Sequence, residues 1–342
     1  MNTQANIQTI IESSFSSLIG MNDAKARIAD NIIVNQKAGK KLLSATVLAP
    51  AGTGKTKLGI AWQSALSQVG FDTLHILPSQ VRKLGGEWDS VISFLTNDRA
   101  PRSLFIDEAH ELFQSGRTVQ LAKLGALAMS ALDGNRPDSQ AIPFSDEISV
   151  RFHRSEFNII LATNFPGKMP EALAGKSGRA PQIILPLYTE AESAQIAHRM
   201  LSAMGIRACE DSLRALGRVA RGSARPLEHL TAQLETIAVK GDKETVNKSD
   251  ILSAMISCGL FPLGFNASEI SVLHFLQSPS VQSTVSARFP HLDNQTLRNF
   301  FGHALGNGLV GKTNGGMTLS DKGRRYFAES KKAGFPVPEL AK

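Results

Sequence analysis

Residues 49–56, which are Ala49-Pro50-Ala51-Gly52-Thr53-Gly54-Lys55-Thr56, decide the fold of this chain. An apolar run, Ala45 to Leu48, precedes them, and an apolar pattern of helical spacing follows from Leu58 to Val69. A strand, a glycine-rich turn and a helix in this order form a phosphate-binding loop. The backbone N–H groups of such a turn point inward, and the helix N-terminus adds the positive end of its dipole. The stretch therefore predicts a nucleoside triphosphate site.

Two side chains of this loop have predicted roles. Lys55 would reach the β- and γ-phosphates, and the Thr56 hydroxyl would ligate Mg²⁺. Ala49 stands where the pattern usually has its first glycine, which is tolerable if its φ is negative. An ordinary strand-to-helix turn could contain the same letters, but the flanking strand and helix favour the phosphate loop. We expect the following residues to bind ATP: Pro50, Ala51, Gly52, Thr53, Gly54, Lys55 and Thr56.

A pair of acids downstream completes the predicted site. The apolar run Ser103 to Ile106 ends in Asp107 and Glu108. Asp107 would hold Mg²⁺, directly or through water, and Glu108 would orient and deprotonate the attacking water. A strand that ends in helix-capping acids would look the same, but the phosphate loop favours the NTPase interpretation. His110 could couple the site to a neighbouring element, or be a polar residue at a helix start.

The composition limits the class of protein. A length of 342 residues predicts two or three domains, and 42% hydrophobic residues fits a globular chain. Cys209 and Cys258 are too few for a disulfide framework or a zinc site, so we expect a cytoplasmic, reducing location. We expect no membrane partner, since no apolar run approaches the roughly 18 residues of a span. The net charge of +7 permits a polyanionic partner but is weak support for one.

The first half of the chain alternates between strand and helix patterns. Further strands are expected at 71–77, 157–164 and 182–187, and helices at 22–37 and 119–132. This alternation predicts an α/β fold with a parallel sheet covered on both faces. Residues 1–15 are polar with scattered isoleucines, and we expect a loosely held arm.

Two features of this half leave alternatives open. Asn164 follows a buried strand and could hold the nucleophilic water, or could be a turn-forming residue before Phe165-Pro166-Gly167. The stretch 133–154 contains two short alternating segments around a polar turn. It could form an exposed hairpin or a plain surface loop.

The second half has a different character. Helical patterns at 189–204, 211–220, 226–239 and 248–257 predict an all-α lid, with Arg225 just before a helix. Helices at 267–276, 280–289 and 294–306, a strand at 317–320 and a closing helix suggest a winged helix-turn-helix. A small helical docking module with a solvated basic face would show the same pattern. The basic residues of this region are Arg298, Lys312, Arg324, Arg325, Lys331 and Lys332.

Taken in order, these motifs resemble the AAA+ ATPases, and among them the RuvB family of Holliday-junction branch-migration motors. The similar points are Leu18-Ile19-Gly20, Asp107-Glu108-Ala109-His110, Tyr188-Thr189-Glu190-Ala191-Glu192, Gly222-Ser223-Ala224-Arg225-Pro226 and the C-terminal winged helix. The resemblance spans roughly residues 16–330 and implies an AAA+ large domain at 16–188. It also implies a helical lid at 189–262 and a winged-helix domain at 263–342, after the arm at 1–15.

The resemblance also implies site residues. Ile19 would contact the adenine base, Asn164 would be the polar residue of sensor 1, and Arg225 would be the sensor 2 arginine. Arg179 stands where the family has its arginine finger, although Gly178-Arg179-Ala180 replaces the usual Arg-Phe pair, and Lys176 is the fallback. The stretch 133–154 takes the place of the hairpin by which RuvB grips its accessory protein RuvA. Rings of this family are typically hexamers.

Three functions follow from these expectations. The first is an ATP-driven, Mg²⁺-dependent ring motor on duplex or branched DNA, held largely independently of sequence by basic residues such as Arg298, Lys312, Arg324 and Arg325. The second is an AAA+ loading or remodelling factor that acts on a replication or recombination protein. The third is a nucleotide switch that oligomerises on DNA and hydrolyses ATP slowly.

Overall fold

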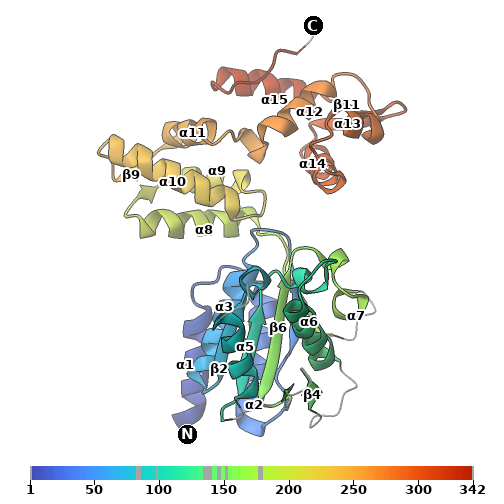
Figure 1. Cartoon of the computed structure of the whole chain (residues 1–342). Coiled ribbons are helices and arrows are strands. Elements are labelled where there is room, and N and C mark those ends of the chain that lie inside the picture. The colour runs from blue at the N-terminus through green and yellow to red at the C-terminus, as the bar shows by residue number, and fades with distance from the viewer. Residues whose placement is uncertain are drawn as a thin grey trace. The chain divides into compact units, whose positions relative to one another are not determined.

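The computed structural model of the chain divides into two compact units, Met1–Tyr188 and Thr189–Lys342, which are described separately (Figure 1). The structure describes residues 2–81, 86–97, 99–133, 141–144, 148–150, 153–175 and 180–340. Among these residues, no helix is long and apolar enough to cross a bilayer.

A parallel sheet forms the centre of the first unit. Within the described residues it has five strands in the order β2-β3-β6-β1-β7, and every pairing is parallel. The strands are β1 (Ala45–Leu48), β2 (Asp72–Ile76), β3 (Arg102–Ile106), β6 (Phe157–Thr163) and β7 (Gln182–Ile184). All residues of β1, β3 and β6 are buried, as expected for parallel strands covered on both faces. The predicted sheet is confirmed.

Helices cover the two faces of this sheet and form two cores (Figure 1). Neighbouring residues of a strand belong to different cores, since Leu104 and Ile106 lie in one and Phe105 lies in the other. One core is built with α1 (Asn2–Phe15), α2 (Asn22–Ala38) and α3 (Lys55–Gln68). The other is built with α4 (Pro78–Val81), α5 (Gly86–Thr96), η1 (Ala109–Phe113), α6 (Val119–Leu132) and α7 (Glu171–Ala174).

Helix α3 approaches the sheet closely and so fixes the phosphate loop at its start. A Cβ atom at Gly59 would lie 2.3 Å from the ring of Phe105, so only glycine allows this distance. The buried Gln63 amide donates hydrogen bonds of 2.9 Å to the carbonyls of Leu74 and Ser103, on two neighbouring strands. Helix α3 is therefore attached to the sheet by both packing and hydrogen bonds.

The interpretation of residues 1–15 as a loosely held arm is wrong. Residues Asn2–Phe15 form α1, and Ile7, Ile11 and Phe15 are buried in the core that contains α3. The three residues recur every four positions, which is the spacing of one helix face. Their burial outweighs the polar residues between them.

The hairpin alternative for residues 133–154 is supported where the structure describes the chain. Strands β4 (Ile142–Pro143) and β5 (Ser149–Val150) pair antiparallel, with Ile142 opposite Val150. Both of these side chains are buried in a core of the first unit. Residues 134–140, 145–147 and 151–152 of the stretch lie outside the described residues.

The second unit begins with a helical lid. It contains α8 (Glu190–Ala203), α9 (Glu210–Val219), α10 (Arg225–Lys240) and α11 (Lys248–Ser257). The lid also contains two short strands that the sequence did not predict, β8 (Arg207–Ala208) after α8 and β9 (Thr245–Val246) after α10. These two strands pair in parallel. Two-residue strands are too short to show a period, which explains why the pattern looked purely helical.

A helical domain with a β-hairpin wing completes the chain. Its elements are η3 (Pro262–Gly264), α12 (Ala267–Phe275), α13 (Gln282–Arg288), α14 (Asn294–Gly306), β10 (Val310–Thr313), β11 (Gly316–Leu319) and α15 (Asp321–Lys332). Strands β10 and β11 are antiparallel, with Val310 opposite Leu319. Three helices followed by such a hairpin form a winged helix-turn-helix.

Candidate active site

The predicted phosphate loop, acidic pair and Asn164 gather at one edge of the sheet in the first unit. Because the carboxyl ends of parallel strands meet at the same edge, the residues that follow β1, β3 and β6 become neighbours. Leu48, the last residue of β1, is opposite Thr163, the last residue of β6. The glycine-rich loop follows β1, the acidic pair follows β3, and Asn164 follows β6. Residues far apart in the sequence therefore meet at one site.

The phosphate loop has a conformation that depends on its glycines. Gly52 and Gly54 have φ values of 76° and 84°, in the left-handed region. A Cβ atom at Gly54 would lie 2.5 Å from both the Met21 Cε and the Tyr188 hydroxyl oxygen. The Thr53 hydroxyl donates a 2.7 Å hydrogen bond to the Pro50 carbonyl, which closes the turn. Helix α3 then begins at Lys55, as a phosphate-binding helix N-terminus requires.

The segment before α2 lies beside this loop. Ile19 is 8% exposed, and Gly20 and Met21 follow with φ values of 64° and 56°. The close approach of Met21 to Gly54 brings the segment against the loop, and the adenine contact of Ile19 stays a prediction. Met21 and Tyr188 were not predicted as site residues. A methionine in the sequence does not indicate a positive φ, so the conformation of Met21 could not be predicted. Tyr188 was recognised only as part of a helix-start motif.

Asp107 and Thr56 form the candidate metal position. The Thr56 hydroxyl donates a hydrogen bond to Asp107 Oδ2, although 51 residues separate the two in the sequence. The backbone N–H of Glu108 donates a 2.9 Å hydrogen bond to Asp107 Oδ1. Mg²⁺ prefers oxygen ligands and is usually held by one or two carboxylates plus phosphates. A hydroxyl and a carboxylate in contact, next to a phosphate loop, fit this ion.

Glu108 and His110 form a polar connection between β3 and β6. Glu108 has a φ of 49°, a left-handed conformation that is uncommon for a non-glycine residue and frequent at functional sites. The Nδ1 atom of His110 lies 3.4 Å from Glu108 Oε2 and 3.2 Å from Thr163 Oγ1. His110 therefore links the acidic motif to the tip of the neighbouring strand, which favours the coupling interpretation of this residue.

Burial favours the neutral form of His110. Desolvation lowers the pKa of His110 below its usual 6.5, and the positive charges of Lys168 and Lys55 lower it further. The carboxylates of Glu108 and Glu111 act in the opposite direction but do not reverse the shift. A neutral imidazole at pH 7 donates one hydrogen bond and accepts another.

Asn164 is available for a ligand. Its Oδ1 atom is buried and has no hydrogen-bond partner in the part of the chain that the structure describes. The turn after β6 uses Thr163 instead, because Thr163 Oγ1 accepts a 3.0 Å hydrogen bond from the N–H of Phe165. A buried amide oxygen left unpaired costs about 1–3 kcal/mol, so a water or substrate donor would stabilise it.

His75 is a further neighbour that the sequence did not reveal. Its ring stacks on Phe105 at a centroid distance of 4.6 Å. Burial lowers the pKa of His75, whereas the nearby Asp107 carboxylate raises it. His75 lies in β2, which pairs with the strand that ends at Asp107, so only the sheet order brings it to the site.

The remaining predicted residues have different outcomes. Arg179 and its fallback Lys176 lie outside the described residues. Arg225 is an exposed residue at the start of α10 in the second unit. The expected DNA contacts Arg298 on α14, Lys312 on β10, and Arg324 and Arg325 on α15 are all exposed. Lys331 instead pairs with Glu339 at 2.5 Å, which reduces the charge that it offers.

Comparisons with known proteins agree with this geometry. Residues 45–186 match the family described as "ATPase family associated with various cellular activities (AAA)". The chain is 25% identical over 327 residues to the Holliday junction branch migration complex subunit RuvB of Campylobacter fetus subsp. fetus (strain 82-40), covering 93% of this chain and 89% of that protein. The RuvB subunit of Campylobacter jejuni (strain RM1221) is 24% identical over 315 residues, covering 91% and 89%.

Solved structures of Thermotoga maritima RuvB have the same fold. The structure described as the Holliday junction branch migration motor is 19% identical, with a TM-score of 0.62, covering 94% of this chain and 96% of that one. A point mutant of the same protein has a TM-score of 0.64 at 19% identity, covering 95% and 98%. These similarities extend over both units of the chain.

Proposed function

We propose that this chain, an AAA+ ATPase that resembles RuvB, forms a ring that uses ATP hydrolysis to move duplex or branched DNA. The observation that supports hydrolysis most directly is the meeting of Lys55, the Thr56–Asp107 contact and Glu108 at one sheet edge. The functions in the names of its relatives, together with the basic winged helix, support DNA as the substrate.

The roles of the site residues follow from their chemistry. Lys55 neutralises phosphate charge, and Thr56 and Asp107 would hold Mg²⁺. When bound, Mg²⁺ neutralises charge on the phosphate oxygens and orients them. Glu108 takes a proton from the water that attacks the γ-phosphorus, and the bond from this phosphorus to the ADP oxygen breaks. Asn164 Oδ1, with its free acceptor capacity, accepts a hydrogen bond from the same water.

Hydrolysis in this proposal needs an adjoining copy of the chain. Arg179, with Lys176 as the fallback, stabilises the charge of the transferring phosphoryl group in the neighbouring subunit, which is worth about 10³-fold or more in rate. Arg225 reports the γ-phosphate to the lid within the same subunit. Rings of six subunits fit this arrangement, because each site then lies between two copies.

The charge of the winged-helix region supports a DNA partner. Residues 263–342 contain nine Lys and Arg residues against five Asp and Glu residues, a net charge of +4. This quarter of the chain therefore has more than half of the total net charge of +7. Contacts of this kind bind phosphate groups with little regard to sequence and weaken steeply as salt rises.

A comparison of ATP turnover with and without DNA tests the proposal. We expect duplex or branched DNA to raise turnover at low salt, with a smaller effect at high salt. Glu108→Gln should bind ATP without hydrolysis and accumulate as a ring on DNA. Arg179→Ala should abolish hydrolysis but retain ATP binding; persistent hydrolysis would move the finger to Lys176.

The second candidate function is a loading or remodelling factor with a protein substrate. The paired strands β4 and β5 support it, because a hairpin at this position offers a docking element for an accessory protein. If DNA changes neither the turnover nor the size of the oligomer at low salt, the motor proposal fails and this candidate takes its place.

A further inference from the structure

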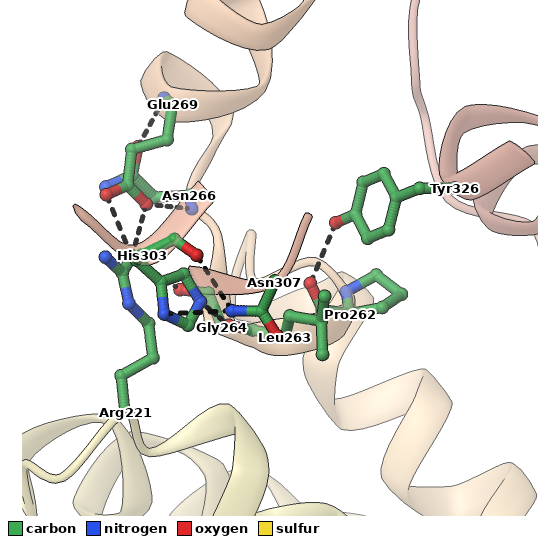
Figure 2. A network of polar contacts seen from close by, with 9 residues as sticks. All are labelled: Arg221, Pro262, Leu263, Gly264, Asn266, Glu269, His303, Asn307 and Tyr326. Carbon is green, nitrogen blue, oxygen red and sulfur yellow. Dashed lines mark hydrogen bonds and ion pairs between the residues drawn. The ribbon is translucent and has the colours of Figure 1, made fainter. Parts of the chain in front are cut away.

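The connector between the helical lid and the winged helix is held by three separate helical regions (Figure 2). The carbonyl of Pro262 accepts a 2.8 Å hydrogen bond from the Tyr326 hydroxyl of α15. The carbonyl of Leu263 lies 2.8 Å from His303 Nε2 of α14, and the carbonyl of Gly264 accepts a 3.4 Å hydrogen bond from Arg221 Nη1. Three consecutive carbonyls thus have partners from three places in the second unit. Such a connector is a fixed joint and not a flexible linker.

A partly buried ion pair forms the centre of this joint. Arg221 Nη1 lies 2.8 Å from both carboxylate oxygens of Glu269, whose side chain is 5% exposed. The same carboxylate accepts a 3.0 Å hydrogen bond from the N–H of Asn266 and so caps α12, the first helix of the winged domain. The Arg221 guanidinium also lies over the Phe265 ring, 5.4 Å from its centroid. Arg221 thereby contacts both the connector and the start of the winged helix.

Arg221 itself belongs to the turn that leads to the predicted sensor. It follows α9, and Arg225 begins α10 four residues later. Its φ of 50° is left-handed, and Gly222 follows with a φ of 78°, so the course of this turn is defined. The turn also packs directly on the connector, since a Cβ atom at Gly264 would lie 2.3 Å from the carbonyl oxygen of Val219.

We infer that the Arg221–Glu269 ion pair couples nucleotide sensing to DNA binding, by fixing the winged helix to the turn that presents Arg225. Four residues of chain span at most about 14 Å, so the ion pair and the sensor cannot move far apart. A change in the position of Arg225 then moves α12, and DNA held by the winged helix biases Arg225 in return. Arg221 and Glu269 are positioning residues that contact neither nucleotide nor DNA. The inference rests on the proposed function, in which both ligands bind.

Coupling of this kind is measurable because it is reciprocal. If ATP changes the affinity for DNA by some factor, DNA changes the affinity for ATP by the same factor, commonly 5- to 150-fold by the usual range of about 1–3 kcal/mol. The quantity to measure is the ratio of DNA dissociation constants with ADP and with a non-hydrolysable ATP analogue. A merely structural role of the ion pair would lower stability and leave this ratio unchanged.

The test uses Glu269→Gln in the full-length chain. Glutamine still accepts the hydrogen bond from Asn266 and preserves the helix cap, but it removes the negative charge opposite Arg221. We expect the ratio of DNA affinities to fall toward 1 and DNA stimulation of turnover to disappear. Turnover without DNA should stay within about twofold of the wild type, because Glu269 is a positioning residue in α12 and not part of the catalytic site. Glu210→Gln is the matched control, since Glu210 pairs with Arg214 at 2.7 Å on the exposed surface of α9.

Each result has a defined meaning. A folded Glu269→Gln protein with the wild-type ratio, or a wild-type ratio of 1, overturns the inference. If Glu269→Gln does not fold, Arg221→Lys keeps the positive charge and loses the contact with two oxygens, and the same outcomes apply to it. If wild-type protein binds no DNA with either nucleotide, the proposed function fails first, and this result differs from a loss of coupling.

Discussion

The catalytic edge of the first unit and the connector of the second unit are both networks of polar groups with long-range contacts, but their groups are distributed differently along the sequence. At the catalytic edge, each group comes from a short contiguous motif at the end of a strand, such as residues 49–56 or Asp107-Glu108. At the connector, the hydrogen-bonded partners are 40 to 64 residues apart, as in His303–Leu263 and Tyr326–Pro262.

This difference explains what each network can do. Phosphate binding uses backbone N–H groups and one helix N-terminus, so a single short stretch supplies most of it. A joint between two domains must instead hold segments from both, so its groups are spread along the chain. Substitutions should distinguish the two networks. Those at the catalytic edge should lower the rate of ATP hydrolysis with little loss of stability. Those at the connector should lower stability with little change in the rate of hydrolysis without DNA.

Glu108→Gln should give the largest effect. Loss of the general base should lower the rate of ATP hydrolysis about 10²- to 10⁴-fold, because glutamine cannot accept the proton from water. Stability should change by less than about 1 kcal/mol, since glutamine keeps the size of a side chain that is 34% exposed. Phosphate release and thermal unfolding measure the two quantities. Glu111→Gln, three residues later, is the control that should retain hydrolysis; a large stability loss in Glu108→Gln would break the comparison.

Gly264→Ala should have the next largest effect, on stability. Gly264 has a φ of 76°, and a Cβ atom there would clash with the Val219 carbonyl oxygen at 2.3 Å. Left-handed backbone costs a non-glycine residue about 1–2 kcal/mol, and overpacking adds about 1–3 kcal/mol. Denaturant unfolding should therefore show a loss of about 2–5 kcal/mol.

A second glycine provides the matched control for this substitution. Gly259 has a φ of 64°, but a Cβ atom there would have no neighbour within 4 Å. Gly259→Ala should cost only the backbone contribution of about 1–2 kcal/mol. Equal losses in the two variants would show that the contact between the connector and the α9–α10 turn is not tight.

The sequence predicted the parts of the molecule that depend on local patterns. Strands β1, β3 and β6, helices α6 and α11, and the order of the domains' elements follow from apolar periodicity and from strand-end motifs. The acidic pair could be placed beside the phosphate loop because both follow parallel strands. The burial of α1 was missed because its three apolar residues are diluted by polar neighbours, and periodicity over so few positions is a weak signal.

The parts that could not be predicted depend on long-range contact. Nothing local in Tyr188 shows that its hydroxyl lies beside Gly54, 134 residues earlier. The left-handed conformations of Met21, Glu108 and Arg221 have no signal in residues other than glycine. The partner of a buried charge such as Glu269 is also set by tertiary structure, so the sequence analysis did not identify the connector.

The two tyrosines of the chain allow a smaller test, because one lies in each region. Tyr326→Phe removes the hydroxyl that donates to the Pro262 carbonyl at 2.8 Å. Loss of one buried hydrogen bond should lower the free energy of unfolding by about 1–2 kcal/mol, without a change in ATP binding. Tyr188→Phe is the control, since its hydroxyl lies by the phosphate loop and not at the connector. A wild-type stability in Tyr326→Phe would remove one of the three attachments of the joint.

The smallest expected effect is a pH dependence that belongs to the connector. Burial lowers the pKa of His303, and the Arg221 cation lowers it further, whereas Glu269 and the Leu263 carbonyl act in the opposite direction. His303 Nε2 donates to Leu263, so Nδ1 is the acceptor that faces Asn307 Nδ2 at 3.3 Å. A second ring proton would remove this acceptor and add a charge near Arg221.

The sign of the effect follows from proton linkage. A histidine whose pKa is lowered in the folded state binds fewer protons than in the unfolded state below about pH 6.5, so stability falls as the pH drops from there through the folded-state pKa. His75 and His110 have lowered pKa values as well, so the wild-type curve alone does not isolate His303. The effect of His303 is isolated by the difference in free energy of unfolding between wild type and His303→Gln. Glutamine keeps a donor for the Leu263 carbonyl and does not titrate. We expect the free energy of unfolding of the wild type, relative to that of His303→Gln, to fall as the pH drops from 7.5 to 5. The exposed His229→Gln is the control. A difference that is constant over this range would show that protonation of His303 does not act on the joint.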